Sequence, residues 1–142
     1  MNSNAKRLRE FHAAVGDPLP SQITMRDADH FALRQKLIDE EHGEVTAVYH
    51  QIITDLQAGA NLDPVAALTP LVHELADLLY VVYGAIETLG IDADAIFQEV
   101  HRANLQKAGG PRRADGKILK PPGWQPADVQ SVIRKQIEEN AA

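Results

Sequence analysis

Apolar residues along this chain recur at helical spacing, and no stretch alternates between apolar and polar positions for long enough to predict a strand. Glycine stops and aspartate or proline starts separate the apolar segments. We therefore predict an all-α helical bundle of four to five helices. The predicted helices cover approximately residues 4–15, 27–58, 69–89, 92–107 and 129–139.

The third predicted helix, over residues 69–89, begins with Thr69 as a cap and Pro70 at the first helical position. Its leucine, valine and isoleucine residues occupy nearly every side, and a helix that is apolar all round is buried all round. A short loop joins it to the preceding helix, so the two are predicted to form a buried central antiparallel pair. Because four or five helices can hardly enclose one of their number, we expect a homodimer to cover the remaining face.

The composition narrows the class of protein. The chain has 142 residues, which is enough for one hydrophobic core, and we predict a single domain over residues 1–142. The absence of cysteine excludes disulfides, thiolate zinc sites, iron–sulfur clusters and cysteine nucleophiles. No uninterrupted apolar run reaches 18 residues, so neither a signal peptide nor a membrane anchor is predicted. We expect a cytoplasmic protein that does not bind membranes.

Charge is unevenly distributed along the sequence. The net charge is −6, so binding to a nucleic-acid polymer is not expected. No lysine or arginine lies between Lys36 and Arg102, whereas 12 acidic residues occur from Asp39 to Glu99. A basic segment rich in glycine and proline follows over residues 109–124. An acidic helical body that binds cations and a basic segment that binds phosphates would account for this separation.

Carboxylates interrupt the apolar faces of the two longest helices. Glu41 and Glu44 lie on the second predicted helix, and Glu74 and Asp77 lie on the third. Residues three or four positions apart share a helical face, so antiparallel packing would bring the two pairs together, with Glu40 beside them. Two like charges 4 Å apart repel by about 4 kcal/mol at an effective dielectric of 20. Several such repulsions would exceed the ~5–15 kcal/mol stability of a typical domain.

No lysine or arginine of either helix is expected to neutralise these carboxylates. They must therefore take up protons or surround a multivalent cation, and an all-oxygen site favours Mg²⁺, with Mn²⁺ as a substitute. A solvated acidic face is the usual explanation for one such pair, but two facing pairs inside apolar stripes argue against it. A ferritin-like di-iron site requires Glu-x-x-His motifs. Here His42 and His73 directly follow or precede an acidic residue and are turned about 100° from it, so di-iron chemistry is disfavoured.

The motif EExxE at Glu40–Glu44, followed by ExxD at Glu74–Asp77, resembles that of the all-α nucleoside triphosphate pyrophosphohydrolases. These comprise the MazG proteins, phosphoribosyl-ATP pyrophosphohydrolase and the dimeric dUTPases. The segments Asn104–Lys107 and Asp115–Pro126 are similar to an Asn-x-x-Lys…Gly-Lys…Lys…Gly-Trp region of many members. The N-terminal helix resembles that of the deinococcal MazG-like dUTP pyrophosphatases, whereas the additional helices and acidic motifs of the larger dimeric dUTPases are lacking.

The resemblance implies a MazG-like fold and hydrolysis of a nucleoside triphosphate between its α and β phosphates, which yields a nucleoside monophosphate and pyrophosphate. It points to dUTP as the substrate, with other nucleoside triphosphates as the fallback. By the same resemblance, Glu41, Glu44, Glu74 and Asp77 are metal ligands. Glu40 is the candidate for orienting or deprotonating the attacking water, unless it holds an additional metal ion.

The resemblance also assigns substrate contacts to the last turns of the fourth predicted helix and to the basic segment after it. The predicted set is Asn104, Lys107, Arg112, Arg113, Lys117 and Lys120. The lysines and one of the arginines would bind the leaving phosphates, and the amide of Asn104 suits a pyrimidine edge. Trp124 is interpreted as an anchor of the loop on the core in preference to a base-stacking residue. A different interpretation stays open, in which the chain is a non-enzymatic helical dimer that acts as a regulatory or interaction module.

Overall fold

The computed structural model describes residues 3–142, and helices account for most of them. The five helices are α1 (Asn4–Ala14), α2 (Ala28–Gln57), α3 (Pro64–Glu87), α4 (Ala93–Leu105) and α5 (Val129–Ala141). Within residues 3–142 the β-type pairing is limited to an isolated bridge between Arg112 and Ile118. The predicted all-α class and the number of helices are confirmed.

Aspartates cap four of the helices, and three of them do so where the sequence predicts. Asp27 accepts a hydrogen bond from the backbone N–H of His30 (2.9 Å), and Asp128 accepts one from Ser131 (3.0 Å). Asp92 accepts from the N–H of Asp94 at the start of α4 (2.9 Å). These carboxylates satisfy N–H groups that have no partner inside the first helical turn, and they fix where each helix begins.

The start of α3 is the one helix boundary that the sequence analysis placed wrongly. The helix begins at Pro64, and Asp63 caps it by accepting from the N–H of Ala66 (2.8 Å). Asp63-Pro64 is thus the cap and first-position proline, and Pro70 lies inside the helix. The hydroxyl of Thr69 donates to the carbonyl of Val65 (2.6 Å) within the helix and does not cap it.

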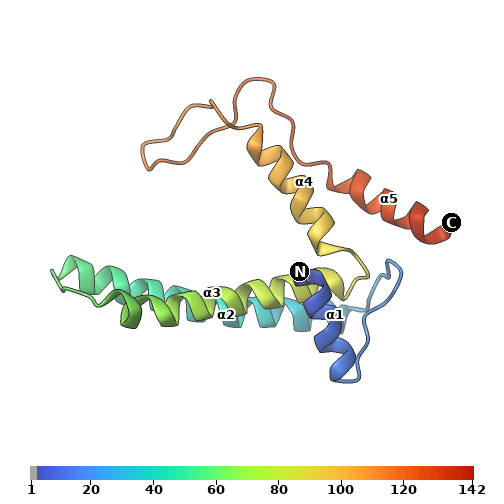
Figure 1. Ribbon diagram of the computed structural model, residues 1–142, viewed down its shortest axis with the longest axis horizontal. Helices are drawn as coiled ribbons and strands as arrows, with labels where there is room; N and C mark the ends of the chain where they lie inside the picture. The colour runs from blue at the N-terminus through green and yellow to red at the C-terminus, as the bar shows by residue number, and fades with distance from the viewer. Residues whose placement is uncertain (1–2) are drawn as a thin grey trace.

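Helices α2 and α3 lie side by side and run antiparallel, and α1 packs across the end where α3 finishes (Figure 1). Helices α4 and α5 pack on each other and diverge from the α2–α3 pair. The small core lies where α1, α3 and α4 meet, and it contains Leu8, Tyr83 and Ala93. The α2–α3 pair and the α4–α5 pair, which we call the α4–α5 arm, are therefore joined at this small core.

A buried carboxylate holds the junction between α3 and α4. Glu87 is 0% exposed, and it accepts a hydrogen bond from the N–H of Ala93, the first residue of α4 (2.7 Å). Its other oxygen lies 2.8 Å from a guanidinium nitrogen of Arg9 on α1. Gly90 in the turn has a positive φ of 73°, and a Cβ there would lie 2.1 Å from the carbonyl oxygen of Gln22. Only glycine fits this close approach.

Helix α3 is not enclosed within a single chain. Val65, Val72 and Leu79 are exposed on it, with Val72 at 60% of its full accessible area. The predicted antiparallel pair is present, but its burial would require a second molecule. Among the described residues, α3 is also the one helix that is long and apolar enough, by length and composition, to cross a membrane.

Candidate metal centre

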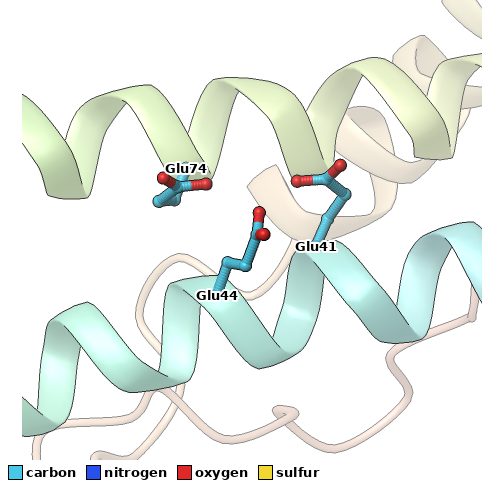
Figure 2. Close-up of side chains that lie close together, drawn as sticks. All are labelled: Glu41, Glu44 and Glu74. Carbon is cyan, nitrogen blue, oxygen red and sulfur yellow. The ribbon is translucent and has the colours of Figure 1, made fainter.

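Three carboxylates from α2 and α3 converge between the two helices. Glu41 and Glu44 extend from α2 toward α3, and Glu74 extends from α3 toward them (Figure 2). Each offers an oxygen atom, and the three oxygen atoms lie within 4.8 Å of one another. The spacing of three residues puts Glu41 and Glu44 on one face of α2, and the antiparallel packing of α3 supplies Glu74 opposite them.

The environment of these groups disfavours their negative charge. Burial raises the pKa of Glu41, and the neighbouring charge of Glu44 raises it further. The pKa of Glu74 is raised by the same two causes. In addition, Oε2 of Glu41 is buried and has no hydrogen-bond partner among the residues that the structure describes. A buried carboxylate oxygen without a donor is costly, so this group needs either a proton or a cation.

The other two predicted acidic residues lie outside this group of three. The carboxylate of Glu40 is 56% exposed and lies 4.0 Å from Nζ of Lys36, one turn away on α2. Asp77 lies 3.2 Å from Nε2 of His73 on α3. The expectation that no basic residue of these helices reaches the carboxylates is therefore wrong for Glu40. The sequence analysis also missed His73, although its spacing of four residues from Asp77 is the signal that reveals it.

The three remaining carboxylates fit a divalent cation. Within residues 3–142, no lysine, arginine or histidine forms an ion pair with Glu41, Glu44 or Glu74. A set of carboxylate oxygens is the ligand type of hard ions such as Mg²⁺. A cation would compensate the mutual repulsion and the unpartnered oxygen of Glu41 together. Asp77 contributes charge to this site, because it raises the pKa of both Glu41 and Glu74.

The basic segment that contains most of the predicted substrate-binding residues is separated from the carboxylates. The basic segment extends from the end of α4, away from the α2–α3 pair (Figure 1). Among the described helices, α4 and α5 have no close backbone approach to α2. Within one chain, the structure therefore does not bring Arg112, Arg113, Lys117 and Lys120 to the carboxylates.

Two basic residues of this segment are engaged inside the loop. Arg113 forms a two-bond ion pair with Asp115, with a Nε–Oδ1 distance of 2.8 Å. Arg112 donates to the carbonyl of Gly116 (3.2 Å). The loop also folds back on itself, since a Cβ at Gly110 would lie 2.3 Å from the carbonyl oxygen of Leu119. The lack of a side chain at Gly110 thus lets the loop pack against its own backbone.

The two lysines nearest α4 meet at a tryptophan. Nζ of Lys107 lies 5.0 Å from the ring centre of Trp124, and Nζ of Lys120 lies 4.9 Å from it. The indole N–H donates to the carbonyl of Ala103 on α4 (2.7 Å), as expected of a residue that anchors the loop. Asn104 is exposed in the last turn of the same helix.

Comparison with known families adds one decisive observation. The family model of phosphoribosyl-ATP pyrophosphohydrolase matches residues 8–104, which is more than half of the chain. The chain belongs to this family. The matched residues include the three converging carboxylates and end before the basic segment and α5. No curated protein sequence matches the chain.

Membership in the phosphoribosyl-ATP pyrophosphohydrolase family places the chain among the all-α, MazG-like pyrophosphohydrolases. The family hydrolyses a nucleotide with release of pyrophosphate, and it generally depends on a divalent metal ion. The acidic cluster supplies the chemistry that such an ion requires. The class of reaction predicted from the sequence is thus confirmed, namely pyrophosphohydrolysis of a nucleotide.

Proposed function

We propose that this protein is an Mg²⁺-dependent nucleoside triphosphate pyrophosphohydrolase that cleaves between the α and β phosphates and forms a nucleoside monophosphate and pyrophosphate. The observation that carries the proposal is the convergence of Glu41, Glu44 and Glu74, which form no ion pair with a basic residue in the described part of the chain. A triphosphate brings about four negative charges, and it approaches an acidic site only when cations lie between the two.

The three converging carboxylates would hold the metal ion, with Asp77 beside them as the fourth predicted ligand. When bound, Mg²⁺ would neutralise phosphate charge, polarise a phosphoryl oxygen and lower the pKa of a water molecule. Mn²⁺ would substitute because it accepts the same oxygen ligands. Nε2 of His73 lies 3.2 Å from Oδ2 of Asp77, which supports a role for His73 in orienting the carboxylate of Asp77.

The proposed reaction breaks one phosphoanhydride bond. A water oxygen attacks the α phosphorus, the bond from this phosphorus to the bridging oxygen breaks, and pyrophosphate leaves with the electron pair. Glu40 would orient the water and accept its proton, because it neighbours the cluster without joining it. Nζ of Lys36 lies 4.0 Å from this carboxylate on the same face of α2.

We propose dUTP as the preferred substrate, on the resemblance of the acidic motifs and the Lys/Trp segment to MazG-like dUTP pyrophosphatases. The exposed amide of Asn104 would hydrogen bond to the edge of the base. Phosphoribosyl-ATP is the second candidate, because the matching family is described by that substrate. The match ends at residue 104, so it leaves out Lys107 and the whole basic segment that we propose to bind phosphates.

We also propose that a homodimer covers the exposed face of α3. Glu74 and Asp77 lie in the middle of this helix, and carboxylates are costly in the hydrocarbon of a membrane. Protein contact on this face is therefore favoured over lipid contact. Neither a membrane nor a nucleic-acid polymer is required by the proposed reaction, and the substrate is a small nucleotide of the cytoplasm.

The test is hydrolysis of a nucleotide panel with Mg²⁺ in ¹⁸O-labelled water. The panel contains dUTP, the other common nucleoside triphosphates and phosphoribosyl-ATP. We expect pyrophosphate and a monophosphate that carries the label, since attack at the α phosphorus puts the new oxygen there. Replacement of Glu44 by Gln should abolish turnover, whereas Asp39→Asn, the matched control on the exposed side of α2, should retain it. Release of orthophosphate, or label in the pyrophosphate, would contradict the proposal.

A further inference from the structure

Trp124 is the single tryptophan of the chain, and its side chain is half-buried against α4. Its indole N–H donates to the carbonyl of Ala103 (2.7 Å). Carbonyl groups in the last turn of a helix have no partner inside the helix, so the indole satisfies one of them. This bond attaches the far end of the basic segment, residue 124, to the helix from which the segment departs.

The same ring contacts the ammonium groups of two lysines. Lys107 follows α4 directly, and Lys120 precedes Trp124 by four residues, yet both Nζ atoms lie about 5 Å from the ring centre. An ammonium group within about 6 Å of an indole centre is attracted by the electron density of the ring. Neither lysine forms an ion pair with a carboxylate anywhere in residues 3–142. Both positive charges are thus held at one ring, and neither has a carboxylate partner within residues 3–142.

The two arginines of the loop differ in this respect. Arg113 is neutralised by Asp115, and Arg112 donates to the carbonyl of Gly116. Two backbone hydrogen bonds order the loop around them, from the N–H of Arg113 to the carbonyl of Lys117 (2.7 Å) and from Leu119 to Pro111 (2.7 Å). Among the basic residues from 107 to 120, Lys107 and Lys120 are thus the two whose ammonium groups contact the aromatic ring and form no ion pair within residues 3–142.

We infer that Trp124 is a positioning residue, which holds Lys107 and Lys120 at one ring as a receptor for the phosphate chain of the substrate. Because one chain does not bring this segment to its own carboxylates, the receptor would serve the carboxylates of the second subunit in the proposed homodimer. This inference rests on the proposed function and adds the residue that organises its phosphate-binding half. Two like charges that are each held about 5 Å from one ring centre repel each other, and a ligand with several negative charges relieves that repulsion. An inorganic polyphosphate carries the same chemistry as the phosphate chain of a nucleotide, so it serves as the probe.

The first experiment measures binding of tripolyphosphate to the full-length protein without metal. Because the chain has one tryptophan, its fluorescence reports on the ring that contacts both lysines. We expect a saturable change in emission, and a dissociation constant raised about 3- to 30-fold by Lys107→Gln or by Lys120→Gln. Lys135→Gln is the matched control, since this exposed lysine of α5 pairs only with Glu139 among the described residues, and it should change binding less than about 2-fold.

The second experiment separates positioning from simple anchoring, with calorimetry as the readout because the tryptophan is replaced. Trp124→Phe keeps an aromatic face and loses the N–H bond to Ala103, whereas Trp124→Leu loses the face as well. Positioning predicts near-normal tripolyphosphate affinity for Phe and a loss of about 10-fold for Leu. KM for the nucleotide should likewise stay near normal in Trp124→Phe and rise in Trp124→Leu, whereas kcat should change less in both variants.

Equal affinities of Phe and Leu variants that unfold at the same urea concentration would overturn the inference, as would normal binding by both lysine variants. Because these measurements use a metal-free probe, they are independent of turnover. Pyrophosphate release with no tripolyphosphate binding would leave the proposed function in place and overturn the inference. Binding that behaves as expected in a protein that hydrolyses no nucleotide would support the receptor and contradict the proposed function.

Discussion

Arg9 and Glu87 form an ion pair of 2.8 Å that joins α1 to the end of α3. The carboxylate of Glu87 is completely buried, and it also accepts the N–H of Ala93, where α4 begins. Three helices thus depend on one acidic side chain. Because the α4–α5 arm carries the basic segment, this junction fixes the direction in which that segment extends.

Replacement of Glu87 by Ala should lower the free energy of unfolding by about 2–4 kcal/mol, because it leaves the N–H of Ala93 without a partner and creates a cavity. Replacement by Gln keeps an oxygen acceptor and should cost less. Urea unfolding measures both values. Equal losses for the two variants would show that the hydrogen bond to Ala93 does not contribute.

Glu99 should make the docking of α5 on α4 sensitive to acid. Two hydrogen bonds from Arg102 and one from the N–H of Asp128 lower the pKa of Glu99 to about 2. The stabilisation is therefore present above the ordinary pKa of 4.5 and is lost as the pH falls toward 2. The protection of α5 amides from hydrogen exchange, relative to the rate of an unstructured peptide at the same pH, should fall over this range in the wild-type protein. In Glu99→Gln, the protection of these amides should already be lower than in the wild type at pH 6, and it should depend less on pH.

The acidic cluster should be strained when no metal ion is present. Replacement of Glu41 and Glu44 together by Gln removes the repulsion that raises the pKa of Glu41 and Glu74. We expect a higher melting temperature than the wild type in a chelator, together with a loss of pyrophosphate release of at least about 100-fold. Asp39→Asn controls for the change in net charge. A lower melting temperature in chelator would indicate that the carboxylates stabilise the metal-free fold.

The exposed face of α3 should mediate self-association. Val72 is 60% exposed in the single chain, and replacement by Lys would put a charge into the proposed interface. We expect the dimer dissociation constant to rise at least about 10-fold in sedimentation velocity. Met25→Lys, at an exposed apolar residue that precedes α2, is the control and should leave association unchanged. A wild-type protein that is monomeric at high concentration would contradict the prediction.

Local features of the fold were predictable from the sequence. Asp27, Asp92 and Asp128 cap helices at the expected positions, because capping depends only on residues within one turn. The start of α3 was predicted wrongly because Thr69-Pro70 and Asp63-Pro64 carry the same signal. The more N-terminal one prevails, and the helix continues through Pro70.

The candidate site was predictable in part. Antiparallel packing brings Glu41, Glu44 and Glu74 together, as their spacing indicates. The ion pairs of Glu40 and Asp77 depend on side-chain rotamers, which the sequence does not specify. The wide separation of the basic segment depends on the junction at Glu87, a contact between residues far apart in the chain. The convergence of two lysines at one ring depends on the fold of a loop for the same reason.

The most direct test of the metal centre is the effect of Mg²⁺ on thermal unfolding of the wild-type protein and of the variant with Gln at positions 41, 44 and 74. A ligand that binds only the folded state stabilises it by about 2.7 kcal/mol at 100 times its dissociation constant. We predict a saturable rise in the melting temperature of the wild type and none in the triple variant. Equal shifts in the two proteins, or no shift in either, would contradict a cation site formed by these three carboxylates.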